Sequence, residues 1–179
     1  MPNSKSETIK YFGFGTNKDL DMMIHMVGNP NLKGEHGKLI GYELCIQNIN
    51  QIRDGIIPPF KKSPREIIKN GFGNSFKLYV IRPKEGKIVY GTIWDLTREE
   101  FERTRNWELV DFGMQEDVKG TAVNSKGEQV QVETQALLKE PREIGSVIEG
   151  DSYDPYIAPK EAMLKTADEV LRDYLKRKV

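Results

Sequence analysis

The sequence predicts an α+β fold in which a twisted or barrel-like antiparallel sheet carries a few helices. Strand-like segments outnumber helix-like ones, and several follow one another with only a short turn between them. The chain also lacks the regular alternation of strands and helices that a parallel, doubly wound sheet requires. With 179 residues and neither a repeat nor a composition shift, it is expected to form one domain over residues 1–179.

Six segments are rich in β-branched and aromatic residues and are expected to be strands: Ile9–Gly15, Lys38–Asn48, Phe76–Arg82, Ile88–Asp95, Val118–Val123 and Gln129–Leu138. Two of the intervals between them are short and contain a glycine. Pro83–Lys87 and Asn124–Glu128 are therefore expected to be hairpin turns. Before the first strand, residues 1–8 are polar and are expected to be disordered.

The first predicted helix follows the first strand. Asn17 is placed to cap it, and Gly28 is placed to end it. Apolar residues at i, i+4 and i+7 put Leu20, Ile24 and Val27 on the face that is expected to be buried.

Two further helices are expected in the second half of the chain. Thr97 and Glu100 form a capping box that opens a short helix ending near Trp107. Pro159 suits the first turn of a last helix, which ends in basic residues that favour a helix C-terminus. The apolar face of this last helix is expected to consist of Leu164, Ala167, Leu171 and Tyr174.

A long segment, Gly55–Asn74, is rich in proline and glycine and is expected to be an irregular loop. Loops of this length inside a compact domain are usually functional, so this one is expected to border a binding pocket. Four cations lie in or near it and could favour an acidic ligand group, or could simply be solvated: Arg53, Lys61, Lys62 and Arg65.

Composition argues against several classes of function. The 27 basic and 27 acidic residues balance, which disfavours nucleic-acid and membrane-surface partners. The segment Lys69–Phe76 faintly resembles an RNA-stacking motif, but its spacing breaks after Gly73. Neither His25 nor His36 has a metal-ligand partner at helical spacing, so no metal site is expected.

The cysteine usage and the N-terminus favour a cytoplasmic protein. Cys45 is the only cysteine, so no internal disulfide is possible, and its mid-strand position indicates a small core residue. The N-terminus has no apolar signal region, and no apolar run approaches the roughly 18 residues of a membrane span.

The segment Tyr11–Asn17 is the first candidate for chemistry. Its two glycines allow the backbone to turn sharply and to expose successive N–H groups, and the helix that follows adds its positive end. Together these features favour an oxyanion or anion cradle. The alternative is a strand with a glycine bulge and a capped helix, because a lone Gly-x-Gly is a weak signal.

Three short motifs, in order, resemble those of the gamma-glutamylcyclotransferase-like (AIG2-like) superfamily. Tyr11–Asn17 is similar to its Tyr-Phe-x-Tyr-Gly-Ser-Asn loop, and Val89–Leu96 to its Val-x-Gly-x-(aliphatic)-(aromatic)-x-Leu strand. Thr104–Glu108 occupies the register of its Leu-Asp-x-x-Glu motif, and Gly41–Leu44 fits its second strand. The order and spacing agree over about Tyr11–Leu138.

This resemblance implies a small mixed or antiparallel β-barrel with flanking helices, the gamma-glutamylcyclotransferase-like fold. Enzymes of the superfamily release 5-oxoproline from gamma-glutamyl compounds, including those of glutathione metabolism, and use no cofactor. By position, Glu108 is the implied acid/base. The residues implied to hold the glutamyl group are Tyr11, Gly13, Phe14, Gly15, Thr16 and Asn17.

Three further residues are possible pocket lining. Gln115 stands seven residues after Glu108, where the animal enzymes have a tyrosine. Tyr153 and Tyr156 lie in a C-terminal loop and either line the pocket or pin a turn by aromatic packing. The oligomeric state is not readable from the sequence.

The residue types suit an intramolecular cyclisation of a small gamma-glutamyl amine or peptide. The substrate's α-amine attacks its own γ-carbonyl, so the protein mainly fixes a conformation. A single carboxylate can take the proton from the amine and pass it to the leaving nitrogen. Burial is expected to raise the pKa of that carboxyl toward neutrality.

The alternative is a non-catalytic small-molecule-binding or scaffold protein of the same fold. The superfamily's Leu-Asp pair is replaced by Thr104 and Arg105, which puts a charge beside the expected site. Leu109 replaces the glycine that usually follows the glutamate, and Thr16 replaces a serine. On this reading Glu108 is a solvated charge at a helix end.

Overall fold

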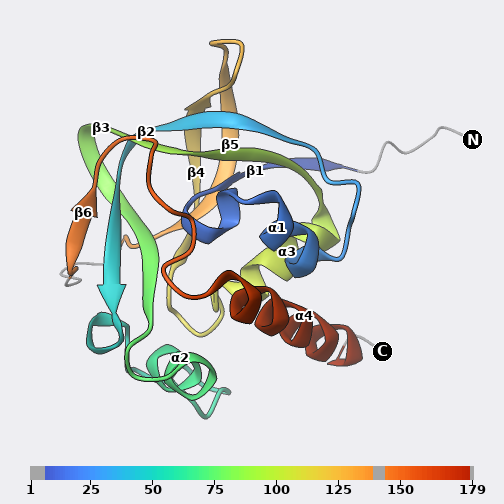
Figure 1. The fold of residues 1–179 in the computed structure, drawn as a ribbon, viewed down its shortest axis with the longest axis vertical. Helices are drawn as coiled ribbons and strands as arrows, with labels where there is room; N and C mark the ends of the chain where they lie inside the picture. The colour runs from blue at the N-terminus through green and yellow to red at the C-terminus, as the bar shows by residue number, and fades with distance from the viewer. Residues whose placement is uncertain (1–6, 139–143, 178–179) are drawn as a thin grey trace, which may run out of the picture.

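The computed structural model, which describes residues 7–138 and 144–177, has a closed five-stranded β-barrel at its centre (Figure 1). The barrel runs β3-β1-β5-β4-β2 and is closed by the pairing of β2 with β3, while the short β6 adds to β2. The β1–β5 pair is parallel and the other pairs are antiparallel. The strands are β1 (Thr8–Gly13), β2 (Gly34–Asn48), β3 (Lys77–Thr97), β4 (Glu116–Val123), β5 (Gln129–Ala136) and β6 (Ser146–Ile148). The predicted mixed barrel with flanking helices is confirmed.

The helices form two groups around the barrel. In Figure 1, α1, α3 and α4 lie together on one side, and α2 lies apart from them near the end of β2. The helical elements are α1 (Leu20–Val27), α2 (Pro64–Phe72), α3 (Arg98–Trp107), α4 (Lys160–Arg177) and the 3-10 turns η1 (Gly15–Lys18) and η2 (Ile49–Gln51). The candidate site lies between these two groups of helices.

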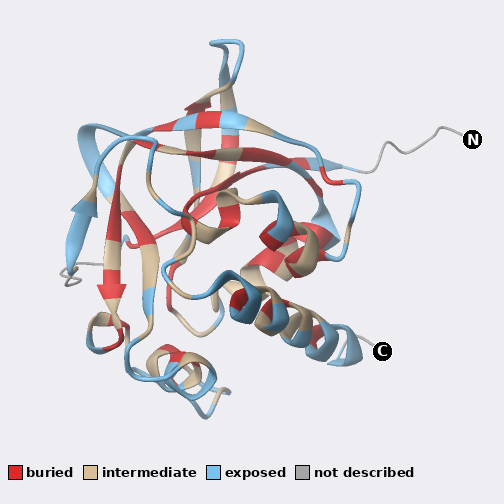
Figure 2. Cartoon of the chain, in the orientation of Figure 1, coloured by how far each residue is buried: buried red, intermediate tan, exposed pale blue. Residues whose placement is uncertain are grey.

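Strand β1 separates the two main cores because alternate side chains point to opposite faces of a strand. Tyr11 packs among the buried residues of α1, α3 and α4, whereas Phe12 packs inside the barrel. In Figure 2 the buried stretches of these helices face the barrel and their outer surfaces are exposed. Cys45 is fully buried on β2, as predicted, and burial raises the pKa of its thiol to about 11.

The predicted hairpin at Pro83–Lys87 is wrong, because β3 is one continuous strand from Lys77 to Thr97. Both halves pair with β2, whose register shifts between Ile40 and Tyr42. Gly41 therefore stands opposite the four residues Lys84–Lys87, and the strand bulges there instead of reversing. Proline and glycine marked an irregularity correctly, but the partner strand decided its type.

Two predictions about α1 are also wrong. Its N-cap is Asp19 rather than Asn17. Of the expected buried face, Val27 is buried, Ile24 is half-buried and Leu20 is 45% exposed. The other buried residues of α1 are Met22, Met23 and Met26. The 3-10 turn η1, which sequence patterns did not indicate, precedes the helix and shifts its buried face.

The segment Gly55–Asn74 is not wholly irregular, because it contains α2. The Ser63 hydroxyl accepts a hydrogen bond from the Glu66 amide, and Pro64 occupies the first turn. The short strand β6 was not predicted, and β5 ends at Ala136 rather than at the predicted Leu138.

Other expectations hold in part: Pro159 directly precedes α4, and β1 ends at Gly13 rather than at Gly15. The capping box of Thr97 and Glu100 opens α3, and the β4–β5 hairpin is present. In α4, Ala167 and Tyr174 are buried as expected, while Leu164 and Leu171 are half-buried. β1 begins at Thr8, and residues 1–6 lie outside the described part of the chain. Within the described residues, no helix is long and apolar enough to cross a membrane.

Candidate active site

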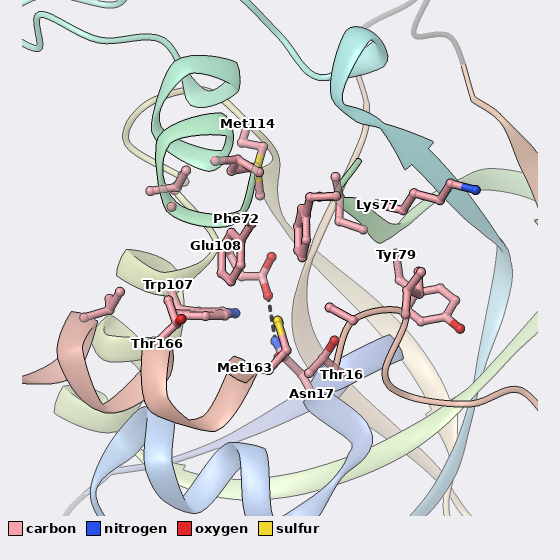
Figure 3. Close-up of a pocket in the computed structure, with 18 of the residues that line it drawn as sticks. Thr16, Asn17, Phe72, Lys77, Tyr79, Trp107, Glu108, Met114, Met163 and Thr166 are labelled. Carbon is pink, nitrogen blue, oxygen red and sulfur yellow. Dashed lines mark hydrogen bonds between the residues drawn. The ribbon is translucent and has the colours of Figure 1, made fainter. Parts of the chain in front are cut away.

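A cavity of about 170 Å³ lies where the end of the barrel meets α2, α3 and α4 (Figure 3). Its wall includes the predicted Glu108 together with Phe14, Thr16 and Asn17 of the glycine loop. Sequence-distant segments therefore meet at one site. Most of the remaining wall is apolar, and its residues include Ile67, Ile68, Phe72, Phe76, Leu78, Trp107, Met114, Ile157 and Met163, together with the exposed Lys77.

Glu108 is the C-cap residue that follows the end of α3 at Trp107, and its side chain points into the cavity. Its two carboxylate oxygens each accept one hydrogen bond. The Asn17 amide nitrogen donates to one oxygen and the Gln115 amide nitrogen to the other, both at 2.7 Å. The alternative of a solvated glutamate at a helix end is thus wrong.

Burial raises the pKa of Glu108 to about 7, and the hydrogen bonds from Asn17 and Gln115 partly oppose this rise. The residue keeps some accessible surface, but its carboxyl group lies in the cavity wall between the side-chain amides of Asn17 and Gln115. Desolvation disfavours the charged form, whereas donated hydrogen bonds favour it. A carboxyl poised near neutral pH can both accept and donate a proton.

A chain of hydrogen bonds fixes the orientation of the Asn17 amide. Its side-chain nitrogen also donates to the Tyr11 hydroxyl at 3.0 Å, and that hydroxyl donates to the side-chain oxygen Oε1 of Gln135 at 3.0 Å. Because the Tyr11 proton is committed to Gln135, its oxygen can only accept from Asn17. Burial also raises the pKa of Tyr11 well above its usual value, so the phenol stays protonated. Tyr11 thus acts on the site through Asn17.

Two glycines of the loop are required by close packing. A Cβ on Gly13 would lie 2.1 Å from the backbone oxygen of Asn17, and one on Gly15 would lie 2.6 Å from Tyr79. Gly15 also has a φ of +58°. The Trp94 indole nitrogen donates to the Asn17 backbone oxygen at 2.8 Å. These contacts seat Asn17 against the barrel with its side chain toward Glu108.

The expected row of exposed N–H groups differs in part from the structure. The backbone N–H of Gly15 donates to the Tyr153 hydroxyl at 3.2 Å, and the backbone N–H of Asn17 donates to the Phe14 carbonyl oxygen at 3.1 Å. Tyr153 in turn donates to the Tyr90 carbonyl oxygen at 2.6 Å. The expectation of a cradle made by these two amides is wrong for the closed loop seen here.

The segment 149–159 crosses the open side of the glycine loop. Thr16 donates to the Pro155 carbonyl oxygen at 3.1 Å, and Tyr156 donates to Asp19 at 2.5 Å. Tyr153 and Tyr156 therefore hold this segment down without lining the cavity themselves, whereas Ile157 does line it. The aromatic pinning alternative is the better description of the two tyrosines.

Solved structures that this protein resembles share the barrel. It aligns with a gamma-glutamyl cyclotransferase at a TM-score of 0.57 and 15% identity, over 79% of this chain and 72% of that chain. The fold is shared. The chain has the gamma-glutamylcyclotransferase-like fold.

Two further structures support this assignment. The human protein loc79017 aligns at a TM-score of 0.55 and 18% identity, over 79% of this chain and 72% of that one. The Arabidopsis thaliana protein At3g28950.1 aligns at a TM-score of 0.51 and 14% identity, over 99% of this chain and 86% of that one. No protein-family model matches the sequence, and neither does any curated protein. The likeness therefore concerns the gamma-glutamylcyclotransferase-like fold alone.

Departures from the superfamily motif have clear structural roles. Thr104 is buried and bonds the Phe101 carbonyl oxygen. Arg105 forms ion pairs with three carboxylates: Glu102, Asp111 and Asp117. Its charge is thus engaged away from Glu108, contrary to expectation.

The other two departures lie beside the carboxyl itself. Leu109 adopts a φ of +53°, the left-handed conformation that a glycine would adopt more easily. Gln115 is buried and donates to Glu108, but it does not line the cavity as expected. The site keeps its hydrogen-bonded carboxyl with different residues around it.

Sequence reasoning missed the apolar part of the cavity. Phe72, Trp107, Met114 and Met163 had no motif to mark them, although Ser63-Pro64 with Glu66 is a helix-start signal that could have placed α2. The expectation that Gly55–Asn74 borders the pocket is confirmed through α2. The four cations proposed for an acidic group do not line it: Arg53, Lys61, Lys62 and Arg65.

Within the described residues, no group of three or more histidine, cysteine, aspartate or glutamate side chains could hold a metal ion. His25 instead pairs with Asp168 at 2.6 Å, and His36 with Asp151 at 3.0 Å. Both contacts lie at the surface and tie separate segments together.

Proposed function

We propose that this protein is a gamma-glutamylcyclotransferase-type enzyme that releases 5-oxoproline from a gamma-glutamyl amine or peptide. One observation carries the proposal. Glu108, whose pKa is about 7, sits in the wall of a cavity beside the glycine loop, with both oxygens positioned by amide donors. This combination of a perturbed carboxyl and a concave site is typical of a general acid/base.

In the proposed reaction, the neutral α-amine of the substrate attacks the γ-carbonyl carbon and closes the five-membered ring. Ionised Glu108 accepts the proton that the amine nitrogen loses as this bond forms. Glu108 returns the proton to the leaving nitrogen as the bond between that nitrogen and the γ-carbon breaks. The products are 5-oxoproline and a free amine, and the carboxylate is regenerated. No co-reactant is consumed, because nucleophile and electrophile belong to one molecule.

Asn17 and Gln115 have a defined part in this scheme. Their hydrogen bonds stabilise the ionised carboxyl and so prevent burial from raising its pKa further. They also fix the direction of both oxygens toward the cavity. Tyr11, hydrogen-bonded to Asn17, acts as a positioning residue for this arrangement.

The test is 5-oxoproline release from a panel of gamma-glutamyl amines, gamma-glutamyl dipeptides and glutathione, with Glu108→Gln in parallel. Loss of the proton shuttle is expected to lower the rate by about 10²–10⁴-fold. Glu99→Gln is the matched control, because Glu99 lies on the same helix, is exposed and pairs with Arg103 rather than with a residue of the site. Full activity in Glu108→Gln would refute the proposed role.

The Glu108→Gln variant is expected to fold. The Gln115 carbonyl oxygen is buried and has no hydrogen-bond partner among the described residues. A half-turn of the Gln115 amide would let this oxygen accept a hydrogen bond from the new amide at position 108. Asn17 could still donate to the remaining oxygen of that side chain.

A second candidate is a non-catalytic binding protein, and one observation favours it. The backbone N–H of Gly15 donates to the Tyr153 hydroxyl, so it is not available to stabilise a developing oxyanion. On this reading the wild type binds gamma-glutamyl amides in a calorimeter but releases no 5-oxoproline. Release that appears only in Tyr153→Phe would show that the hydroxyl blocks the amide.

A further inference from the structure

The cavity has two chemically different ends, which Glu108 separates. In Figure 3, Asn17 and Thr16 lie on one side of Glu108, and Phe72 and Met114 lie on the other. The first side is polar, because the Thr16 hydroxyl, bonded to Pro155, and the Asn17 side-chain amide, bonded to Glu108, lie there. The second is almost entirely apolar.

The apolar end is built from α2, the end of α3 and two connecting segments. Phe72 of α2 stacks on Phe76 at a centroid distance of 4.3 Å and meets the edge of Trp107 at 6.3 Å. Ile68 and Met114 also line the cavity, and they belong to a buried cluster against which Phe72 and Phe76 pack. A rigid apolar wall of this kind favours apolar ligand groups, since their burial removes hydrocarbon surface from water.

Charge is scarce around the cavity. Among the residues that line it, only Glu108 and Lys77 are charged. Lys77 is exposed, and in Figure 3 its ammonium points away from the cavity. Nearby Arg65 is engaged by the carbonyl oxygens of Asn50 and Ile52. A carboxylate placed against the apolar wall would thus lose water without gaining a cation.

The proposed reaction assigns each end to one part of the substrate. Glu108 must reach both the α-amine and the leaving nitrogen, so the scissile bond lies next to its carboxyl. If the glutamyl group faces Asn17 and Thr16, the substituent on the leaving nitrogen lies toward Phe72 and Met114.

We infer that the leaving amine of the substrate carries an uncharged apolar group, such as an aromatic ring or a branched aliphatic chain. This inference rests on the proposed function. Such a group would bury its surface against Phe72, Trp107 and Met114. Glutathione, whose leaving part ends in a carboxylate, is therefore a poor substrate.

The test compares two ligands on the full-length Glu108→Gln protein by isothermal titration calorimetry. Gamma-glutamyl-benzylamide carries one apolar ring, whereas gamma-glutamylglycine carries a carboxylate. Burial of the ring is expected to make the benzylamide bind at least about 10-fold more tightly. Equal affinities, or tighter binding of gamma-glutamylglycine, would overturn the inference.

Phe72→Ala, added to the same protein, examines the wall itself. It is expected to weaken benzylamide binding by about 10-fold and to leave gamma-glutamylglycine unaffected. Phe60→Ala is the matched control, because Phe60 stacks on Phe112 at 3.9 Å outside the cavity. An equal loss for both ligands in Phe72→Ala would count against the inference. The ligand comparison stands without this variant if it fails to fold.

Turnover by the wild type separates the two proposals. Preferred binding of the benzylamide without release of 5-oxoproline would refute the proposed enzyme while supporting the apolar ligand class. Fastest release from gamma-glutamylglycine would support the enzyme and overturn the apolar leaving group.

Discussion

The two ends of the cavity are stabilised by different interactions: hydrogen bonds at the polar end and aromatic packing at the apolar end. At the polar end, hydrogen bonds of 2.7 to 3.0 Å connect Gln115, Glu108, Asn17 and Tyr11. At the apolar end, stacked rings of Phe72 and Phe76 make the wall, and no direction is imposed by a donor or an acceptor. Direction matters for proton transfer and shape matters for selectivity. The contrast teaches that the two properties can change separately here.

The largest expected effect concerns stability at the polar end. Burial raises the pKa of Glu108 from 4.5 to about 7, so the native state keeps a proton that the unfolded chain has released. The associated stability is complete below pH 4.5 and is lost as the pH rises through 7. It amounts to at most about 3 kcal/mol.

Glu108→Gln is expected to remove this pH dependence. Urea unfolding from pH 4.5 to 8 measures the difference in unfolding free energy between wild type and variant at each pH. Relative to the variant, the wild type should lose stability steadily over that range. A constant difference would mean that the pKa of Glu108 is not raised, and the polar end would lose its distinguishing property.

Asn17→Ala sharpens the comparison through activity. Loss of its hydrogen bond raises the pKa of Glu108 further, so the acidic limb of the pH–rate profile should move to higher pH. The shift should be about one pH unit or more, with a rate loss of about 10–100-fold near neutral pH. Asn106→Ala is the control, since Asn106 also lines the cavity but bonds Arg177. A rate loss without any shift would indicate a purely structural effect.

A glycine at each end gives opposite expectations. At the polar end, Gly13→Ala would place a methyl group against the Asn17 backbone oxygen. The ideal Cβ position lies only 2.1 Å from that oxygen. The backbone must move, and the unfolding free energy should fall by about 1–3 kcal/mol, as measured by urea unfolding. Benzylamide binding at the apolar end should be weakened less than turnover. Unchanged turnover would separate Gly13 from the seating of Asn17.

The smallest effect is expected at the apolar end. Gly71 lies in α2, and a Cβ there meets nothing within 4 Å. Gly71→Ala should raise the unfolding free energy by about 0.5–1 kcal/mol because alanine loses less entropy in a helix. A thermal melt measures this. A fall in stability would show that α2 is not formed as the structure has it.

The sequence was informative where chemistry and motif coincide. Glu108 and Asn17 were found by register, and the structure joins them by a direct hydrogen bond. The role first given to Asn17 as a helix cap was wrong, because a polar side chain at a strand end can bond a distant group as readily as a local one. Local pattern does not distinguish these two partners.

The apolar end could not be predicted because its residues are ordinary core residues until the fold places them. Phe72 and Met163 come from α2 and α4, which lie far apart in sequence and meet only across the cavity. The hairpin misassigned at Pro83–Lys87 has the same origin, since β2 decides that β3 continues. Long-range pairing carries information that a window of residues lacks.

Cys45 has a practical consequence for following the segment 149–159 in solution. The thiol is fully buried and its pKa is about 11, so almost none of it is in the reactive thiolate form near neutral pH. It is also the only cysteine in the chain. A cysteine introduced at exposed Ser152 would therefore take up a thiol-reactive fluorophore alone. The natural sequence is thus already suited to site-specific labelling, and no native thiol has to be removed first.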